Sequence, residues 1–194
     1  MDSAESERVA LANPQSGLRI HNKIIQDTVV FVQRTNGLNS TLLNLELMPG
    51  GGAIPHIHRT FEETFICQEG ELSVLVAPRT VKLRPGETVT VPKGVTHRFF
   101  NDTAQNIRFR IEIAPGNRDF EDGLIILYGL ANDGLTNNKS VPKNLAHLGL
   151  VSELGDLNLP FPMSLLHIIL QPITARARKQ GVLDDLRRRY CPLP

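Results

Sequence analysis

The chain has 194 residues, of which 41% are hydrophobic, and a formal net charge of +1. This length and apolar content suffice for one buried core and predict a single globular domain with appendages. The positive charge is concentrated in residues 175–194, which carry six Lys or Arg against two Asp. Because the rest of the chain is net acidic, no basic surface is expected over its body, which argues against a nucleic-acid-binding protein.

The cysteines and the first residues bear on the cellular compartment. Cys67 and Cys191 are far apart and show no CxxC spacing. The N-terminal residues lack the charged, apolar and small-residue order of a secretory signal. We therefore expect a cytoplasmic protein in a reducing environment.

The first two segments differ in their hydrophobic pattern. Residues 1–17 mix charged residues with Ser, Asn and Pro, so we expect a flexible N-terminal segment without chemistry. From residue 18 to residue 115, apolar residues recur with period two in short runs, separated by turn sequences such as NG, MPGGG, RPGE and PKG. Short strands with turns between them predict an antiparallel β-sandwich or β-barrel over residues 18–115.

Residues 116–194 are predicted to form a helical C-terminal extension that packs on the barrel or on a dimer partner. The first helix has its apolar residues on one face, an N-cap before them and a stop after them (Phe120, Leu124, Leu127 and Ala131; Asn117; Asp133 and Gly134). A second helix is expected over residues 144–154. A third begins near Pro162, and Pro172 is expected to kink or break it.

The apolar run 161–173 belongs to this third helix. It is well short of the roughly 20 residues that span a bilayer. We expect it to pack on the sheet or on a second subunit. Contact of the basic tail with a membrane surface is a less favoured alternative.

Two histidines precede one of the predicted strands. Residues i and i+2 of a strand lie on the same face, roughly 6.5 to 7 Å apart, so His56 and His58 can both turn an imidazole toward one ion. Alternation places Glu63 on the face of Phe65 and Cys67, which is expected to be the interior, and Glu62 on the outer face. A carboxylate in the interior is costly unless a positive group meets it.

A third histidine, His97, follows a second strand and a Pro-x-Gly turn. Together these two regions closely resemble the cupin superfamily, in particular its small single-domain members. The first cupin motif is matched without a gap, and so is the second (Gly50, His56, His58, Glu63 and Gly70; Gly86, Pro92, Gly94, His97 and Asn101). The motifs cover residues 40–115 and do not describe the extension.

The resemblance implies a jelly-roll β-barrel, commonly a homodimer, that holds one divalent metal ion on His56, His58, Glu63 and His97. Three imidazoles and one carboxylate suit Fe, Mn, Ni, Cu or Zn, and the spacing does not choose among them. Such an ion supports oxygenation, isomerisation, decarboxylation or cyclisation of a small organic molecule, so an enzyme, including an oxidoreductase, is expected. The alternatives are a barrel whose histidines hold no metal, and a non-catalytic module that binds or senses a small ligand.

Three further residues are candidates for the pocket around this site: Phe65, Cys67 and Phe99. Each lies two or four positions from Glu63 or His97 on the same strand, so it is expected to face the same interior. Arg108 and Arg110 alternate with apolar residues and are expected to face outward. No residue is assigned a catalytic role.

Overall fold

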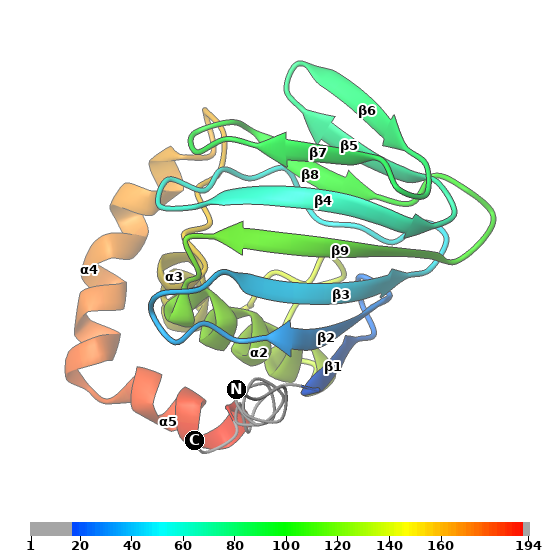
Figure 1. Ribbon diagram of the computed structural model, residues 1–194. Coiled ribbons are helices and arrows are strands. Elements are labelled where there is room, and N and C mark those ends of the chain that lie inside the picture. The colour runs from blue at the N-terminus through cyan, green and yellow to red at the C-terminus, as the bar shows by residue number, and fades with distance from the viewer. Residues whose placement is uncertain (1–16, 192–194) are drawn as a thin grey trace.

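The computed structural model describes residues 17–191, so most of the segment expected to be flexible, residues 1–16, lies outside the described residues. The described chain forms nine strands and four helices (Figure 1). The strands are β1 (Arg19–Asn22), β2 (Asp27–Gln33), β3 (Thr41–Leu47), β4 (Glu62–Glu69), β5 (Leu72–Val76), β6 (Arg79–Leu83), β7 (Thr88–Val91), β8 (His97–Phe100) and β9 (Ile107–Ala114). The helices are α2 (Arg118–Asn132), α3 (Leu145–Leu154), α4 (Leu165–Lys179) and α5 (Val182–Tyr190).

The strands form two antiparallel sheets, and all their pairings are antiparallel. The larger sheet has the order β1-β2-β3-β9-β4-β7, and the smaller has the order β6-β5-β8. The two sheets make a jelly-roll β-barrel, and the helices follow it in the chain, as the sequence predicts. Non-neighbouring strands pair because β9 returns to lie between β3 and β4 (Figure 1).

Alternation along the strands decides which side chains form the core. In β9 the residues Ile107, Phe109, Ile111 and Ile113 are buried, whereas Arg108 and Arg110 lie on the outer face, as predicted. Arg108 pairs there with Glu69, and Arg110 donates to Asn44. Period two thus places one apolar face of the larger sheet against the interior.

The first two helices begin where the sequence predicts. The side chain of Asn117 accepts a hydrogen bond from the amide of Phe120 at the start of α2. The side chain of Asn144 accepts from the amides of Ala146 and His147 at the start of α3. Both asparagines are therefore N-caps that satisfy amides of the first helical turn.

Helix α2 packs behind the larger sheet, where its residues share one hydrophobic core with the strands (Figure 1). A buried ion pair fixes its start, since Arg34 Nε donates to Glu121 Oε2 over 2.7 Å and both side chains are almost fully buried. Glu121 also accepts hydrogen bonds from the Thr35 amide and the Thr41 hydroxyl. These added partners offset the cost of burying both charges.

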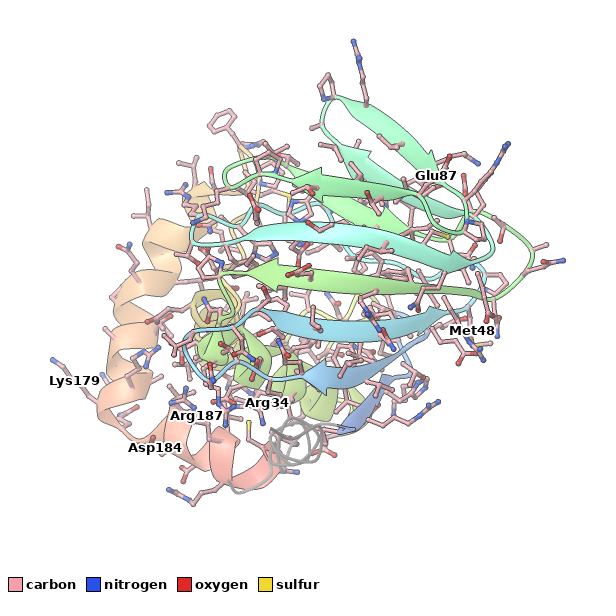
Figure 2. All side chains as sticks on the ribbon, viewed as in Figure 1. Arg34, Met48, Glu87, Lys179, Asp184 and Arg187 are labelled. Atoms are coloured by element: carbon pink, nitrogen blue, oxygen red, sulfur yellow. The ribbon has the colours of Figure 1, made fainter. Side chains whose placement is uncertain are left out.

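The last two helices pack on the first two: α4 lies against α3, and α5 lies against α2. Asp122 of α2 bonds Arg34 near the sheet and Arg187 of α5, and Figure 2 shows both arginines in this region. Helix α4 continues through Pro172, so of the predicted kink or break, the break does not occur. Pro172 and Ile168, whose carbonyl loses its helical partner, are both on the exposed side, where water can replace the missing bond. Among residues 17–191, no helix has the length and apolar character needed to cross a membrane.

Candidate metal centre

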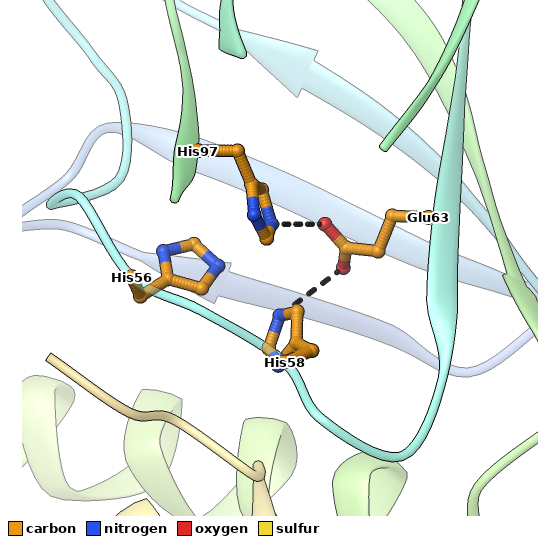
Figure 3. A group of neighbouring side chains, drawn as sticks. All are labelled: His56, His58, Glu63 and His97. Atoms are coloured by element: carbon orange, nitrogen blue, oxygen red, sulfur yellow. Dashed lines mark hydrogen bonds and ion pairs between the residues drawn. The ribbon is translucent and has the colours of Figure 1, made fainter. Parts of the chain in front are cut away.

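Four side chains named from the sequence come together inside the barrel: His56, His58, Glu63 and His97. One ligand atom from each lies within 4.8 Å of those of the others, and all four residues are buried. Figure 3 shows the three imidazoles and the carboxylate turned toward a common centre. Glu63 comes from β4 and His97 is the first residue of β8, while the other two precede β4.

Main-chain pairing explains how the histidines meet. His56 and His97 exchange two backbone hydrogen bonds, each of 2.9 Å, in an isolated antiparallel bridge. The turn before β8 also contacts the other histidine, because the amide of Gly94 donates to the carbonyl of His58 over 2.8 Å. Gly94 has a φ of +82°, which favours glycine at this position of the second motif.

Each imidazole has its Nδ1 bonded to a main-chain carbonyl. The acceptors are Ile54 for His56 (2.7 Å), Asp156 for His58 (3.1 Å) and Val95 for His97 (2.9 Å). A carbonyl only accepts hydrogen bonds, so each Nδ1 carries a proton and each Nε2 faces the centre. The Nε2 atoms of His56 and His58 then present lone pairs, whereas that of His97 donates to the Glu63 carboxylate, so that ring carries both protons. Such partners fix the tautomer and ring orientation of histidines that bind metals.

Burial keeps two of the imidazoles neutral. It lowers the pKa of His56 to about 3, with a further contribution from the neighbouring His58 and His97. Burial also lowers the pKa of His58, although Glu63 opposes this. The Nε2 atom of His58 has no hydrogen-bond partner among the described residues. A buried nitrogen lone pair without a partner is a fitting ligand for a cation.

Glu63 and His97 form the charged pair of the site. Their Oε2 and Nε2 atoms are 3.0 Å apart, and Glu63 Oε1 is 3.6 Å from His58 Nε2. Burial works against the Glu63 carboxylate, but the histidines outweigh it and lower its pKa to about 2. For His97, burial likewise opposes the charged form, but the hydrogen bond and charge of Glu63 raise its pKa.

The C-terminal extension contributes to this centre through Asp156. Its carbonyl holds His58, and its carboxylate accepts hydrogen bonds from the amides of Arg59 and Thr60 over 2.5 and 2.7 Å. Asn158 pairs with Ile57 in an isolated antiparallel β-bridge. The segment after α3 is thus hydrogen-bonded to the segment before β4 that carries His56 and His58.

A cavity of about 280 Å³ opens from the cluster, with His56, His58 and Glu63 in its wall. Apolar side chains from the larger sheet and from the extension line most of it, among them Val29, Leu43, Leu45, Leu124, Leu127, Val151 and Leu166. Phe99 lines it as predicted. Phe65 and Cys67 do not, because they lie further along β4 than Glu63 and are buried in the barrel core. Glu62 is exposed, as alternation predicts.

Sequence reasoning missed a buried pair at the cavity. Tyr128 of α2 lines it and donates a hydrogen bond of 2.5 Å to the buried Asp27. Asp156 was missed as well. A signal existed for Asp27, because it alternates with Val29 and Phe31 along β2 and so faces the interior. A signal existed for Tyr128 as well, because it follows Leu124 by four helical positions and so lies on the predicted apolar face. No sequence signal pointed to Asp156.

Comparison with known proteins agrees with this site. Residues 44–114, which contain all four clustered residues, match the family model described as "Cupin domain". A relative, "Germin-like protein subfamily 1 member 1" of Arabidopsis thaliana, is 33% identical over 86 residues. That match covers 40% of this chain and 40% of the relative, so the chain spans well under two thirds of the relative's length.

Solved structures with a similar fold include three of different description. KdgF from Halomonas sp. is 16% identical, with 48% of this chain and 82% of that chain covered at a TM-score of 0.42. The polyketide cyclase RemF from Streptomyces resistomycificus is 25% identical (52% and 68% covered, TM-score 0.42). A sugar phosphate isomerase of the cupin superfamily from Silicibacter pomeroyi is 19% identical (50% and 69% covered, TM-score 0.45).

The family match, the two complete motifs and the jelly-roll barrel agree with one another, and this chain therefore carries a cupin domain.

Proposed function

We propose that this protein is a divalent-metal-dependent enzyme that acts on a small, largely apolar organic molecule. The observation that carries the proposal is the shared arrangement of the three histidines. Each has Nδ1 bonded to a carbonyl and Nε2 turned toward Glu63, at the wall of an apolar cavity. Orientation of this kind serves metal binding, because imidazoles that only pack in a core do not need a common centre.

The residues present fit a divalent ion. Three imidazole nitrogens and one carboxylate suit Fe(II), Mn(II), Ni(II), Cu(II) or Zn(II), once His97 has released its Nε2 proton to bind the ion. A bound ion of this kind supplies a Lewis acid or a redox centre beside the cavity. The protein's own residues would bind the molecule against Phe99, Leu124 and Leu127 and would keep water from it. Oxygenase, isomerase, decarboxylase and cyclase chemistry all remain compatible with this arrangement.

Elemental analysis tests the metal. Untagged protein purified without added metal or chelator is expected to contain close to one equivalent of a transition metal per chain. The variant His97→Ala should lose it, whereas His21→Ala, which removes an exposed histidine outside the cluster, should keep it. Equal metal contents in the wild type and in His97→Ala, with both proteins folded by circular dichroism, would refute the proposal.

A second candidate function is binding or sensing of a small ligand without turnover. The Glu63 carboxylate and the His97 imidazole bond each other over 3.0 Å, so both are satisfied without an ion. If the purified protein contains no metal even after growth with added metal, this function is favoured. Mass spectrometry of denatured protein should then release a retained organic molecule.

A further inference from the structure

The cavity has a second polar end. Positions along α2 give its distance from the metal cluster. Phe120 lies at the cluster, since its ring centroid is 6.0 Å from that of His58. Tyr128, which lines the same cavity, follows Phe120 by eight helical positions, or about 12 Å along the helix axis at ~1.5 Å per residue. Between them, Leu124 and Leu127 line the wall. An apolar stretch thus separates Tyr128 from the histidines.

The sheet register independently shows that the two ends are apart, and it gives a longer distance because it joins different residues. Asp27 pairs with Leu47, which pairs with Ile107 of β9, whereas Glu63 pairs with Ile113 of the same strand. Ile107 and Ile113 are six positions apart, or about 20 Å at ~3.3 Å per residue. Asp27 and Glu63 therefore lie toward opposite ends of the larger sheet, and both face its inner side.

The pair at the second end is buried and incompletely satisfied. Asp27 and Tyr128 are 1% and 3% exposed, and the Tyr128 hydroxyl donates to Asp27 Oδ2. Asp27 Oδ1 has no partner among the described residues other than the amide of its own residue. Burial raises the pKa of Asp27 to about 7, although the bond from Tyr128 and that amide oppose this. Because the Tyr128 hydroxyl proton is donated to Asp27, the phenolic oxygen of this cavity-lining residue keeps acceptor capacity.

A hydroxyl group continues this polar end. Asn22 is the cross-strand neighbour of Asp27, and its amide donates to Ser140 Oγ over 2.8 Å. Ser140 lines the cavity, and because its oxygen accepts from Asn22, its hydroxyl proton can be donated to a ligand. The second end thus offers an acceptor on Tyr128 and a donor on Ser140, while Asp27 fixes the Tyr128 hydroxyl. A ligand hydroxyl can use both kinds of group.

We propose that Tyr128 and Ser140, with Asp27 behind them holding the Tyr128 hydroxyl, form a second subsite, which recognises a hydroxyl group at the far end of an elongated, otherwise apolar substrate. This inference rests on the proposed function for the other end of the substrate, where an oxygen of the ligand faces the metal cluster. The substrate class is therefore an apolar molecule with an oxygen donor at one end and a hydroxyl at the other.

Isothermal titration calorimetry with three series of synthetic probes tests the subsite. The series are alkanoates from hexanoate to tetradecanoate, the same chains with a terminal hydroxyl, and the same chains with a terminal amine. In metal-loaded wild type, the terminal hydroxyl is expected to tighten binding about 2- to 10-fold, the range for one net hydrogen bond. The gain should appear only in the longer chains, because short chains cannot span the apolar stretch.

Replacement of the pair by apolar groups separates recognition from a structural role. In the double variant Asp27→Leu/Tyr128→Phe, neither partner leaves the other unsatisfied, and the hydroxyl preference should disappear. Tyr190→Phe is the matched control, since Tyr190 also donates to an aspartate, Asp133, but does not line the cavity. It should keep the preference. A preference that persists in the double variant would overturn the inference.

The wild-type data decide the matter even if the double variant does not fold. If the terminal hydroxyl gives no gain at any chain length, or if the terminal amine gives the larger gain, the subsite is not a hydroxyl site. The same titrations on protein without metal separate the two proposals. A hydroxyl preference that is unchanged by metal, with no effect of metal on the affinity of any probe, would refute the metal end and leave the subsite standing.

Discussion

The Nε2 atom of His58 faces the cluster because Nδ1 is bonded to the carbonyl of Asp156, a residue 98 positions later in the chain. The carboxylate of the same residue fixes the segment after His58 through the amides of Arg59 and Thr60. Both interactions restrict the ring to the orientation that a metal ligand needs. Asp156 is therefore a positioning residue for a candidate ligand, although it cannot reach the ion itself.

Replacement of Asp156 should weaken metal binding without removal of a ligand. In Asp156→Ala, Arg59 and Thr60 lose the carboxylate that accepts their three hydrogen bonds, and the affinity for the metal is expected to fall about 10- to 100-fold. Competition with a chromophoric chelator measures this. Asp133→Ala, which removes an aspartate that bonds side chains of α5, is the control and should keep the wild-type affinity. An unchanged affinity in Asp156→Ala would contradict the assigned role.

The raised pKa of Asp27 predicts a pH dependence of stability. Its pKa is about 7 in the folded protein, mainly because of burial, against 3.8 for an ordinary aspartate. Between these values the native state holds a proton that the unfolded state has released, so the free energy of unfolding falls as pH rises from about 4 to about 7. Relative to Asp27→Asn, the wild type should lose a few kcal/mol of stability across this window.

Urea unfolding of both proteins between pH 4 and pH 8 measures that difference. Titration of the histidines and of Glu63 occurs in both proteins and cancels in the comparison. Tyr190→Phe is again the control, because the pKa of Tyr190, raised by burial and by Asp133, is about 12. Its difference from the wild type should stay constant over the window. Parallel curves for Asp27→Asn and the wild type would show that Asp27 is not protonated in the native state.

The residues of the cluster could be predicted from the sequence, whereas their supports could not. Alternation along β4 put Glu63 inside, and both motifs named the histidines. The same alternation places Asp27 inside β2, but its partner Tyr128 is 101 positions away on a helix. Local periodicity identifies the face of a residue and contains no information about the distant group that meets it.

At the scale of the elements, sequence patterns that depend only on nearby residues predicted the strands and the helix starts correctly. Strand alternation and the N-caps Asn117 and Asn144 depend on neighbours within a few residues, and the structure agrees with them. Pro172 does not break α4, because the effect of a proline in a helix also depends on tertiary packing. Helix α4 packs on α3, where Gly149 leaves room for the side chain of Thr174, and this packing holds the helix across the proline.

The exposed face of α4 is where we expect the homodimer that the sequence suggests. Five large apolar side chains on α4 and the turn before it are 55% to 81% exposed: Phe161, Met163, Leu165, Ile168 and Ile169. No Lys or Arg occurs between residues 161 and 169, whereas a helix on an anionic membrane surface carries basic residues among its apolar ones. This charge pattern favours a second copy of the chain as the partner.

Light scattering after size exclusion checks this expectation. The wild type should elute with twice the mass of the chain, and Ile168→Glu/Ile169→Glu should elute as a monomer, because the buried apolar contact would gain unpaired charges. Arg176→Glu, an exposed change further along α4, is the control and should remain a dimer. Monomeric wild type that sediments with anionic vesicles would instead support the membrane contact.

At the scale of the whole molecule, the extension completes the barrel. The smaller sheet has three strands against six in the larger one, and α2 packs behind the larger sheet. Periodicity predicted that α2 has an apolar face, but the resemblance to cupins ends near residue 115 and gave no partner for that face. The cavity is consequently shared, with β2 and β3 on one side and α2 and α3 on the other.

Removal of the extension should therefore destroy the site as well as the helices. A chain ending at Ala114 would expose the core face that Phe120, Ile125 and Tyr128 cover and would leave Arg34 buried without Glu121. We expect such a chain to lose its cooperative thermal transition, to bind ANS and to bind no metal.

A truncation that removes only the last two helices separates the two contributions of the extension. A chain ending at residue 160 keeps α2 and the hydrogen bonds from Asp156 but loses α4 and α5, which bury Ala177, Leu183 and Leu186 against α2 and α3. Its melting temperature should fall, yet it should still bind metal, because the acceptor that orients His58 is retained. If the chain ending at Ala114 melted cooperatively and bound one equivalent of metal, the barrel would be complete without its helices, and the extension would have no part in forming the site.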